Sequence, residues 1–148
     1  MPRTPLVRFA LISGLVLAGC SDTGTKTYSP AEVQIQKVAF SGKPLIVWYF
    51  YSVTPDCKQS GSVLVEITKP PRNGSVEVQH NVEHFPEYPV SNTRYRCNTE
   101  KVASEAVTYT SRSGFLGTDA FSVRTLYPSS GDVSSRAFKI SVENPPKQ

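Results

Sequence analysis

Short runs in which apolar and polar residues alternate, separated by turn residues, make up most of the chain after residue 32. Alternation with a period of two places apolar side chains on one face of a β-strand and polar ones on the other. No window shows the helical period of 3.6 residues over ten positions. The alternating runs lie at residues 63–68, 76–79, 121–124 and 138–143. They predict an all-β protein in which each run supplies one wall of a core.

The run from Leu45 to Tyr51 differs from the others because it is apolar on both faces. Such a run suits a central strand that is covered on both sides, and we expect it to form the centre of the core. Further strands near residues 33–40 and 103–110 bring the number to about seven. Prolines fall mainly between the runs and mark strand ends, because they lack the N–H that a ladder requires. This spacing predicts a two-sheet β-sandwich.

Residues 1–19 have the order of an export signal. Arg3 and Arg8 carry charge without a nearby acid, an apolar stretch follows, and small residues precede Cys20. The apolar stretch is shorter than the roughly 20 residues that a membrane-spanning helix needs. The string Leu17-Ala18-Gly19-Cys20 resembles the bacterial lipobox, which implies cleavage before Cys20 and attachment of a lipid to its thiol. An ordinary secretory signal with a coincidental cysteine is the alternative.

After cleavage, we interpret residues 20–32 as a flexible tether and residues 33–148 as one β-sandwich domain. The tether is rich in Ser, Thr and Gly and spans roughly 20 Å root-mean-square. Loss of the signal removes two arginines, so 14 Lys and Arg remain against 12 Asp and Glu, and the formal charge falls from +4 to about +2. Because the basic residues are scattered among acids and form no stripe, the charge pattern argues against nucleic-acid binding.

The chain has three cysteines, an odd number for an exported protein. If Cys20 carries the lipid, Cys57 and Cys97 remain as one pair. An oxidising periplasm favours a disulfide between them, which would close a loop of about 41 residues. A metal-binding pair and two free thiols are the alternatives.

Two stretches go beyond a general β pattern: Pro-Pro-Arg-Asn-Gly-Ser-Val at residues 70–76, and residues 109–123, which include Gly-Phe-Leu-Gly-Thr-Asp-Ala-Phe. Together they resemble the bacterial immunoglobulin-like and cadherin-like modules of large surface proteins, over roughly residues 62–143. The resemblance implies an immunoglobulin-like sandwich. Ser111 stands where those modules usually have proline, the module is solitary, and the cysteine pair is an addition. Trp48 precedes both cysteines, so their disulfide is not the pin of antibody domains.

The motif residues of these stretches suggest structural roles. Asn73 and Gly74 predict the left-handed backbone of a hairpin turn. Gly114 and Gly117 allow a tight loop before the next strand, and Asp119 can fix that loop by accepting hydrogen bonds from nearby N–H groups. The acidic clusters that bind calcium between cadherin repeats are missing from the sequence, so single acids such as Asp119 are interpreted as turn-capping or solvated groups.

The string from His80 to His84 matches the His-x-x-Glu-His pattern of one class of zinc peptidase. That chemistry needs a helix, whereas the preceding residues predict a strand and Pro86 follows closely. In an extended strand, the two imidazoles would lie roughly 13 Å apart. Two solvent-facing histidines are therefore expected, with a turn that brings them onto one metal as the alternative. Without a Gly-x-Ser-x-Gly elbow or a cofactor motif, we predict no enzyme, no cofactor and no metal site.

Residues 84–97 form a proline-stiffened loop that ends at one of the paired cysteines. Tyr and Arg on a rigid loop are the residue types that contribute most at recognition sites. The loop is therefore a candidate binding surface, and the alternative is that its aromatic side chains only cover the open end of the sandwich. The candidate residues are Phe85, Tyr88, Arg94, Tyr95 and Arg96.

These features together predict a lipid-anchored, non-catalytic binding or scaffolding module of adhesion type in the bacterial cell envelope. Its partners would be the membrane, through the lipid, and an envelope protein or glycan. An Asp directly after the lipidated cysteine would retain the protein at the inner membrane. Because Ser21 stands at that position, we expect the protein at the outer membrane, facing the periplasm. Asp22, one place later, argues in the opposite direction. An inhibitor or regulator of an envelope enzyme, such as a muramidase or a protease, is the alternative function.

Overall fold

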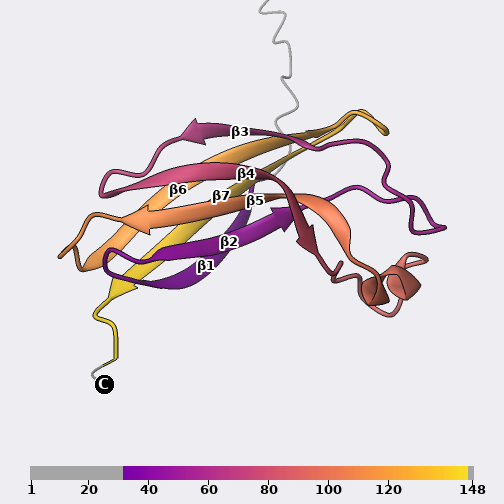
Figure 1. Ribbon diagram of the computed structural model, residues 1–148. Helices are drawn as coiled ribbons and strands as arrows, with labels where there is room; N and C mark the ends of the chain where they lie inside the picture. Colours follow the sequence, from indigo (N-terminus) through magenta and orange to yellow (C-terminus); the bar gives the residue numbers. More distant parts are fainter. Residues whose placement is uncertain (1–31, 147–148) are drawn as a thin grey trace, which may run out of the picture.

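Seven β-strands form two sheets in the computed structural model, which describes residues 32–146 (Figure 1). Apart from one short 3-10 helix, η1, every regular element of these residues is a β-strand. The all-β prediction is therefore confirmed. The elements are β1 (Val33–Phe40), β2 (Pro44–Phe50), β3 (Leu64–Lys69), β4 (Gly74–His84), η1 (Tyr95–Thr99), β5 (Val102–Ser111), β6 (Gly117–Tyr127) and β7 (Asp132–Glu143).

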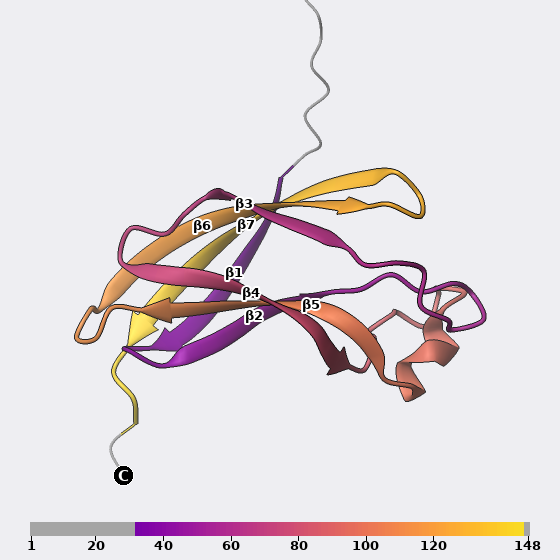
Figure 2. The same cartoon turned by 45° about the horizontal axis from the view of Figure 1, so that its top comes forward.

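The strand order is that of an immunoglobulin-like sandwich. One sheet has the order β1-β7-β6-β3 and the other β2-β5-β4. In chain order, β2, β4 and β5 correspond to strands B, D and E of an immunoglobulin domain, and β3, β6 and β7 correspond to C, F and G. β1 runs parallel to β7, with Val33 opposite Arg136 and Phe40 opposite Glu143. The predicted two-sheet sandwich is confirmed, and the two views in Figures 1 and 2 show its layers.

The core lies between the sheets and follows the predicted alternation. Phe121 and Phe138, opposite each other on β6 and β7, stack with ring centroids 4.8 Å apart. The ring of Tyr109 lies 6.0 Å from that of Phe121 and joins the second sheet to the stack. Burying aromatic side chains of this size contributes a large share of the apolar stabilisation of a small sandwich. The other buried core residues are Ala39, Val47, Phe50, Val63, Val107, Val123, Ile140 and Val142.

The prediction that residues 45–51 form a central strand is wrong. These residues form β2 at the edge of the three-stranded sheet, and β5 is the central strand. β5 is buried along both faces, although Ser104, Thr108 and Ser111 give it a polar sequence. A bulge between Ile46 and Trp48 interrupts the pairing of β2 with β5. The apolar residues of β2 therefore serve two surfaces, the core and an open cleft beside the strand.

Asp119 on β6 accepts four hydrogen bonds, which link it to the loop between β3 and β4 and to the second sheet. Its carboxylate accepts bonds from the N–H groups of Arg72 (3.0 Å), Asn73 (2.9 Å) and Ala120 (2.9 Å), and from the Tyr109 hydroxyl (3.0 Å). The side chain is buried, which raises the pKa of Asp119, but these bonds together lower the pKa by more, so it lies below its ordinary value. Burial and the Asp119 carboxylate raise the pKa of the Tyr109 hydroxyl.

Glycine is required in the two motifs for two different structural reasons. Gly114 and Gly117 have φ values of 79° and 121°, which favour glycine. The left-handed backbone predicted at Asn73 and Gly74 is wrong, because neither residue has a positive φ. A Cβ on Gly74 would instead lie 2.5 Å from the Thr110 carbonyl oxygen and 2.8 Å from the Tyr109 ring. Glycine at this position permits the close approach of β4 to β5.

We expect Gly74→Ala to lower the free energy of unfolding by about 1–3 kcal/mol, because the added methyl group forces β4 away from Tyr109. Urea unfolding followed by circular dichroism measures the change. Ser75→Ala, an exposed neighbour on the same strand, is the control and should alter stability by less than about 0.5 kcal/mol. Equal unfolding midpoints for the two variants would show that the close approach at Gly74 is unimportant.

Candidate functional site

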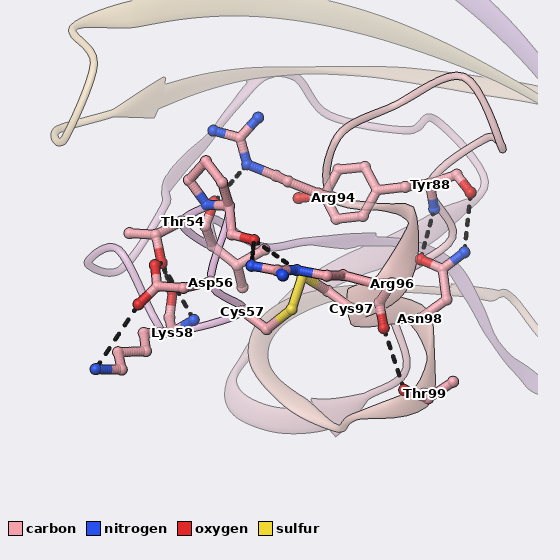
Figure 3. Close-up of a disulfide and its surroundings, with 12 residues drawn as sticks. Thr54, Asp56, Cys57, Lys58, Tyr88, Arg94, Arg96, Cys97, Asn98 and Thr99 are labelled. Atoms are coloured by element: carbon pink, nitrogen blue, oxygen red, sulfur yellow. Dashed lines mark hydrogen bonds and ion pairs between the residues drawn. A yellow bond between two sulfur atoms is a disulfide. The ribbon is translucent and has the colours of Figure 1, made fainter.

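A disulfide between Cys57 and Cys97 braces one end of the sandwich (Figure 3). Cys57 lies in the connection between β2 and β3, with a φ of 67°, and Cys97 lies in η1. The disulfide belongs to a second, smaller core, in which Val53, Cys97 and Val102 are buried and Tyr51 and Tyr88 pack against them. The predicted pairing is therefore present, and it joins two loops at the end of the molecule.

Two arginines strengthen the same junction. The Arg94 Nε donates to the Val53 carbonyl oxygen at 2.7 Å. The Arg96 Nε and Nη2 both donate to the Pro55 carbonyl oxygen, at 3.0 and 2.6 Å. Farther along the loop, Asn98 exchanges two side-chain hydrogen bonds with the backbone of Tyr88, each 2.9 Å long. Figure 3 shows these bonds beside the disulfide, so the loop is held at several points.

An open cleft of about 740 Å³ lies beside this braced end. Its walls come from β2 and the loop that follows it, from the 84–97 loop, and from the turn between β6 and β7. The lining includes five aromatic residues, three cations and two acids, together with hydroxyl-bearing and aliphatic side chains. The aromatic lining residues are Trp48, Tyr49, Tyr51, Tyr88 and Tyr127; the cations are Lys37, Arg94 and Arg136; and the acids are Glu87 and Asp132.

Four aromatic rings pack against one another along one wall of the cleft. His84 stacks on Tyr49 with ring centroids 3.8 Å apart and planes inclined by 10°. Tyr51 meets Tyr88 edge-on at 5.7 Å, and the Tyr51 hydroxyl accepts a hydrogen bond from the Glu87 N–H at 2.8 Å. Burial lowers the pKa of His84, although the Glu87 carboxylate raises it, so the imidazole is neutral at neutral pH. A neutral ring suits this apolar stack.

Trp48 lies beside two cations from the opposite sheet. The Arg136 guanidinium on β7 is 5.2 Å from the centroid of the Trp48 ring and 4.9 Å from that of Phe50. The Lys37 ammonium on β1 is 5.7 Å from the Trp48 centroid. Cation–π attraction at these distances favours the observed arrangement. The cleft therefore combines an aromatic surface with fixed positive charge.

The structure brings only part of the predicted binding loop to the cleft. Tyr88 and Arg94 line it. Arg96 instead bridges to Pro55, and Phe85 and Tyr95 lie outside the cleft, each 48% exposed. The lining residues on β1, β2 and β7 were missed by sequence reasoning. The only signal that could have indicated them was the unusual aromatic content of residues 48–51.

The two histidines have different partners. His80 lies beside a bulge at Asn81, which has a φ of 58°, and its Nδ1 contacts the buried Glu105 carboxylate. His84 stacks on Tyr49.

Among residues 32–146, no group of three or more His, Cys, Asp and Glu side chains is arranged to hold a metal ion. Cys20, the predicted lipidation site, lies outside the described residues.

Comparison with known proteins gives no assignment. No protein-family model matches the chain, and no curated protein matches it. Within the part of the chain that the structure covers, no helix is long and apolar enough to cross a membrane. The cleft and its braced walls are therefore the features from which a function can be inferred.

Proposed function

We propose that the protein is a lipid-anchored, non-catalytic binding module of the bacterial cell envelope and that the cleft is its recognition surface. The observation that carries this proposal is the aromatic and cationic lining of a cleft whose walls are cross-linked by a disulfide. Tyr, Trp and Arg are the residue types found most often at energetic hot spots. A volume of about 740 Å³ falls in the range of ligand-binding clefts.

The bracing of the walls supports a binding role. Ordering mobile side chains and loops on association costs free energy, and walls that are fixed beforehand reduce that cost. Arg94 and Cys97 hold the 84–97 loop against the loop that follows β2. His84 and Tyr51 are packed in the aromatic wall, which favours recognition over catalysis by these groups.

The membrane part of the proposal rests on the sequence before β1. The lipobox-like residues 17–20 support acylation of Cys20, and Ser21 supports an outer-membrane destination facing the periplasm. β1 begins at Val33, directly opposite Arg136, which lines the cleft. The tether would therefore join the domain near its recognition surface.

A second candidate function is inhibition or regulation of an envelope enzyme by the 84–97 loop. The observation that favours it is the exposure of three apolar side chains on this braced loop: Phe85 and Tyr95 are 48% exposed and Val90 is 78% exposed. Such a loop could enter the active-site groove of a muramidase or a protease. Inhibition assays with both enzyme classes test this candidate.

Crosslinking in intact envelopes, followed by purification and mass spectrometry, tests the proposed recognition surface. We expect the combined change Trp48→Ala and Tyr88→Ala to reduce partner recovery roughly tenfold or more, because both rings are lost from the cleft. Lys37→Glu, which changes a partly exposed side chain of the same cleft, should act in the same direction without a risk to the core.

The matched control is the combined change Phe85→Ala and Tyr95→Ala, which removes two aromatic rings outside the cleft. Recovery should then stay at the wild-type level. If this control abolished partner recovery while the cleft variants retained it, the loop would be the recognition surface and the cleft assignment would be wrong.

A further inference from the structure

We propose that the cleft receives an extended, acidic segment of a partner polypeptide, which adds as a strand to the free edge of β2. The proposal rests on the binding function inferred above and names the class of its partner. It combines the position of β2 in its sheet, the course of the cleft along that strand and the charge of the lining residues.

β2 offers an unpaired backbone edge. It pairs with β5 on one side, and within residues 32–146 no strand pairs with its other side. β1 precedes β2 in the chain but pairs with β7 in the other sheet. Every second residue of an edge strand directs its N–H and C=O groups away from the sheet. These groups can form a ladder with another extended backbone, which has to accommodate the bulge between Ile46 and Trp48.

The cleft runs along this edge. Ile46, Val47, Trp48 and Tyr49 all line it, although successive side chains of a strand point to opposite faces of the sheet. Consecutive residues can border one cleft when the cleft lies against the edge of their strand. The loop after β2 continues the lining from Tyr51 to Pro55. The length of edge from Ile46 to Phe50 would pair with a strand of about five residues, roughly 17 Å long.

The occupant that this geometry favours is a polypeptide. An added strand gains main-chain hydrogen bonds from the edge and places alternate side chains against the cleft walls. A glycan has no donors and acceptors at the spacing of a β-ladder. The aromatic rings of Trp48 and Tyr51 provide surfaces for the alternate side chains of the added strand.

Charge favours an acidic segment. Lys37, Arg94 and Arg136 line the cleft, against the acids Glu87 and Asp132. Arg94 donates through Nε to Val53, and Arg136 donates through Nη1 to the Ser134 hydroxyl. Because a guanidinium has five N–H donors, both side chains have further donors for carboxylates.

Short peptides selected from a random phage-displayed library on the full chain, purified from membranes in detergent, test the proposal. Trp48 is the only tryptophan in the sequence and lies in the cleft, so its fluorescence reports occupancy. We expect the selected peptides to be acidic and to change this fluorescence. In an added strand, the N–H groups of every second peptide residue face β2 and the others face away. Methylation of the peptide nitrogens that face β2 should therefore weaken binding roughly tenfold or more. Methylation of the alternate set should have little effect.

Two charge-reversal variants of the protein, one inside the cleft and one outside it, test the contribution of charge to peptide binding. Lys37→Glu should weaken peptide binding, whereas Lys43→Glu, the same change in the turn between β1 and β2, should leave it unchanged. Two results would overturn strand addition: equal tolerance of methylation at both sets of peptide nitrogens, or no peptide that alters Trp48 fluorescence. If envelope crosslinking still depended on the cleft in that case, only the partner class would be wrong. If crosslinking also failed, the proposed function itself would be wrong.

Hydrogen exchange distinguishes a partner peptide from the chain's own segment before β1 as the occupant of the edge. If residues 21–31 of the same chain occupied the edge, the amides of β2 would be protected from hydrogen exchange in the isolated protein and would lose that protection when the segment is deleted. This result would overturn the assignment of the edge to a partner.

Discussion

Replacing Asp119 with alanine will lower the free energy of unfolding by about 4 kcal/mol, one of the two largest effects that we expect from a change in this domain. The substitution leaves the N–H groups of Arg72, Asn73 and Ala120 and the hydroxyl of Tyr109 without their common acceptor. A hydrogen bond to a charged group contributes about 1.5–3 kcal/mol, and the contributions of four bonds to one carboxylate are not additive. Urea unfolding at neutral pH measures the loss.

Tyr109→Phe is the control, because it removes one of these four bonds and keeps the aromatic ring in the core. We expect a loss of about 2 kcal/mol, because the bond that is lost goes to a charged group. If Asp119→Ala cost no more than Tyr109→Phe, the bonds from Arg72, Asn73 and Ala120 would add nothing to stability.

The same carboxylate predicts how stability depends on pH. The pKa of Asp119 is lower in the folded protein than in the unfolded chain, where it is about 3.9. The stability that it contributes is therefore complete above that unfolded value and is lost as the pH falls through the folded value. Asp119→Asn should flatten the acid limb of a stability profile measured below about pH 5.

Removal of the disulfide is the second change with a large expected effect. We expect the combined substitution Cys57→Ala and Cys97→Ala to cost about 4 kcal/mol, because the unfolded chain regains the entropy of a loop closed over 40 residues. Cys97 is also fully buried in the small core at the end of the sandwich, so the loss includes packing. Thermal unfolding with and without reductant provides the measurement.

Arg96→Ala is the matched control for the junction, because Arg96 links the same two loops through the exposed Pro55 carbonyl. Its cost should be about 1 kcal/mol or less. The cysteine variant should also bind the envelope partner more weakly, since the loops that wall the cleft lose their covalent link. Equal unfolding temperatures for the oxidised protein and the cysteine variant would contradict the stabilising role of the disulfide.

The core-facing residues were correctly predicted where apolar and polar residues alternate along a strand. Phe121 and Val123 on β6 are buried while Arg124 is exposed, and Phe138 and Ile140 on β7 follow the same rule. The position of β2 could not be predicted, since a strand that is apolar on both faces can be central or can line a cleft at an edge. The polar sequence of β5 concealed its central position: β5 lies between β2 and β4, and its hydroxyl groups and Glu105 are buried there.

The cleft was only partly predictable for a topological reason. Tyr88 and Arg94 belong to one loop, whose composition indicated recognition. Trp48, Lys37 and Arg136 come from three strands in two different sheets, and no local pattern in the sequence shows that they meet. The parallel pairing of β1 with β7 brings Lys37 and Arg136 to the same side of the sandwich and faces them toward β2.

Export and lipid attachment are tested most directly by intact-mass spectrometry of the protein purified from its native membranes, after treatment with an alkylating reagent. We predict a chain that begins at Cys20, carries a lipid on that residue and has no thiol that reacts, because the other two sulfurs form the disulfide. A chain that begins at Met1, with all three cysteines alkylated, would contradict the proposed place of the protein in the cell envelope.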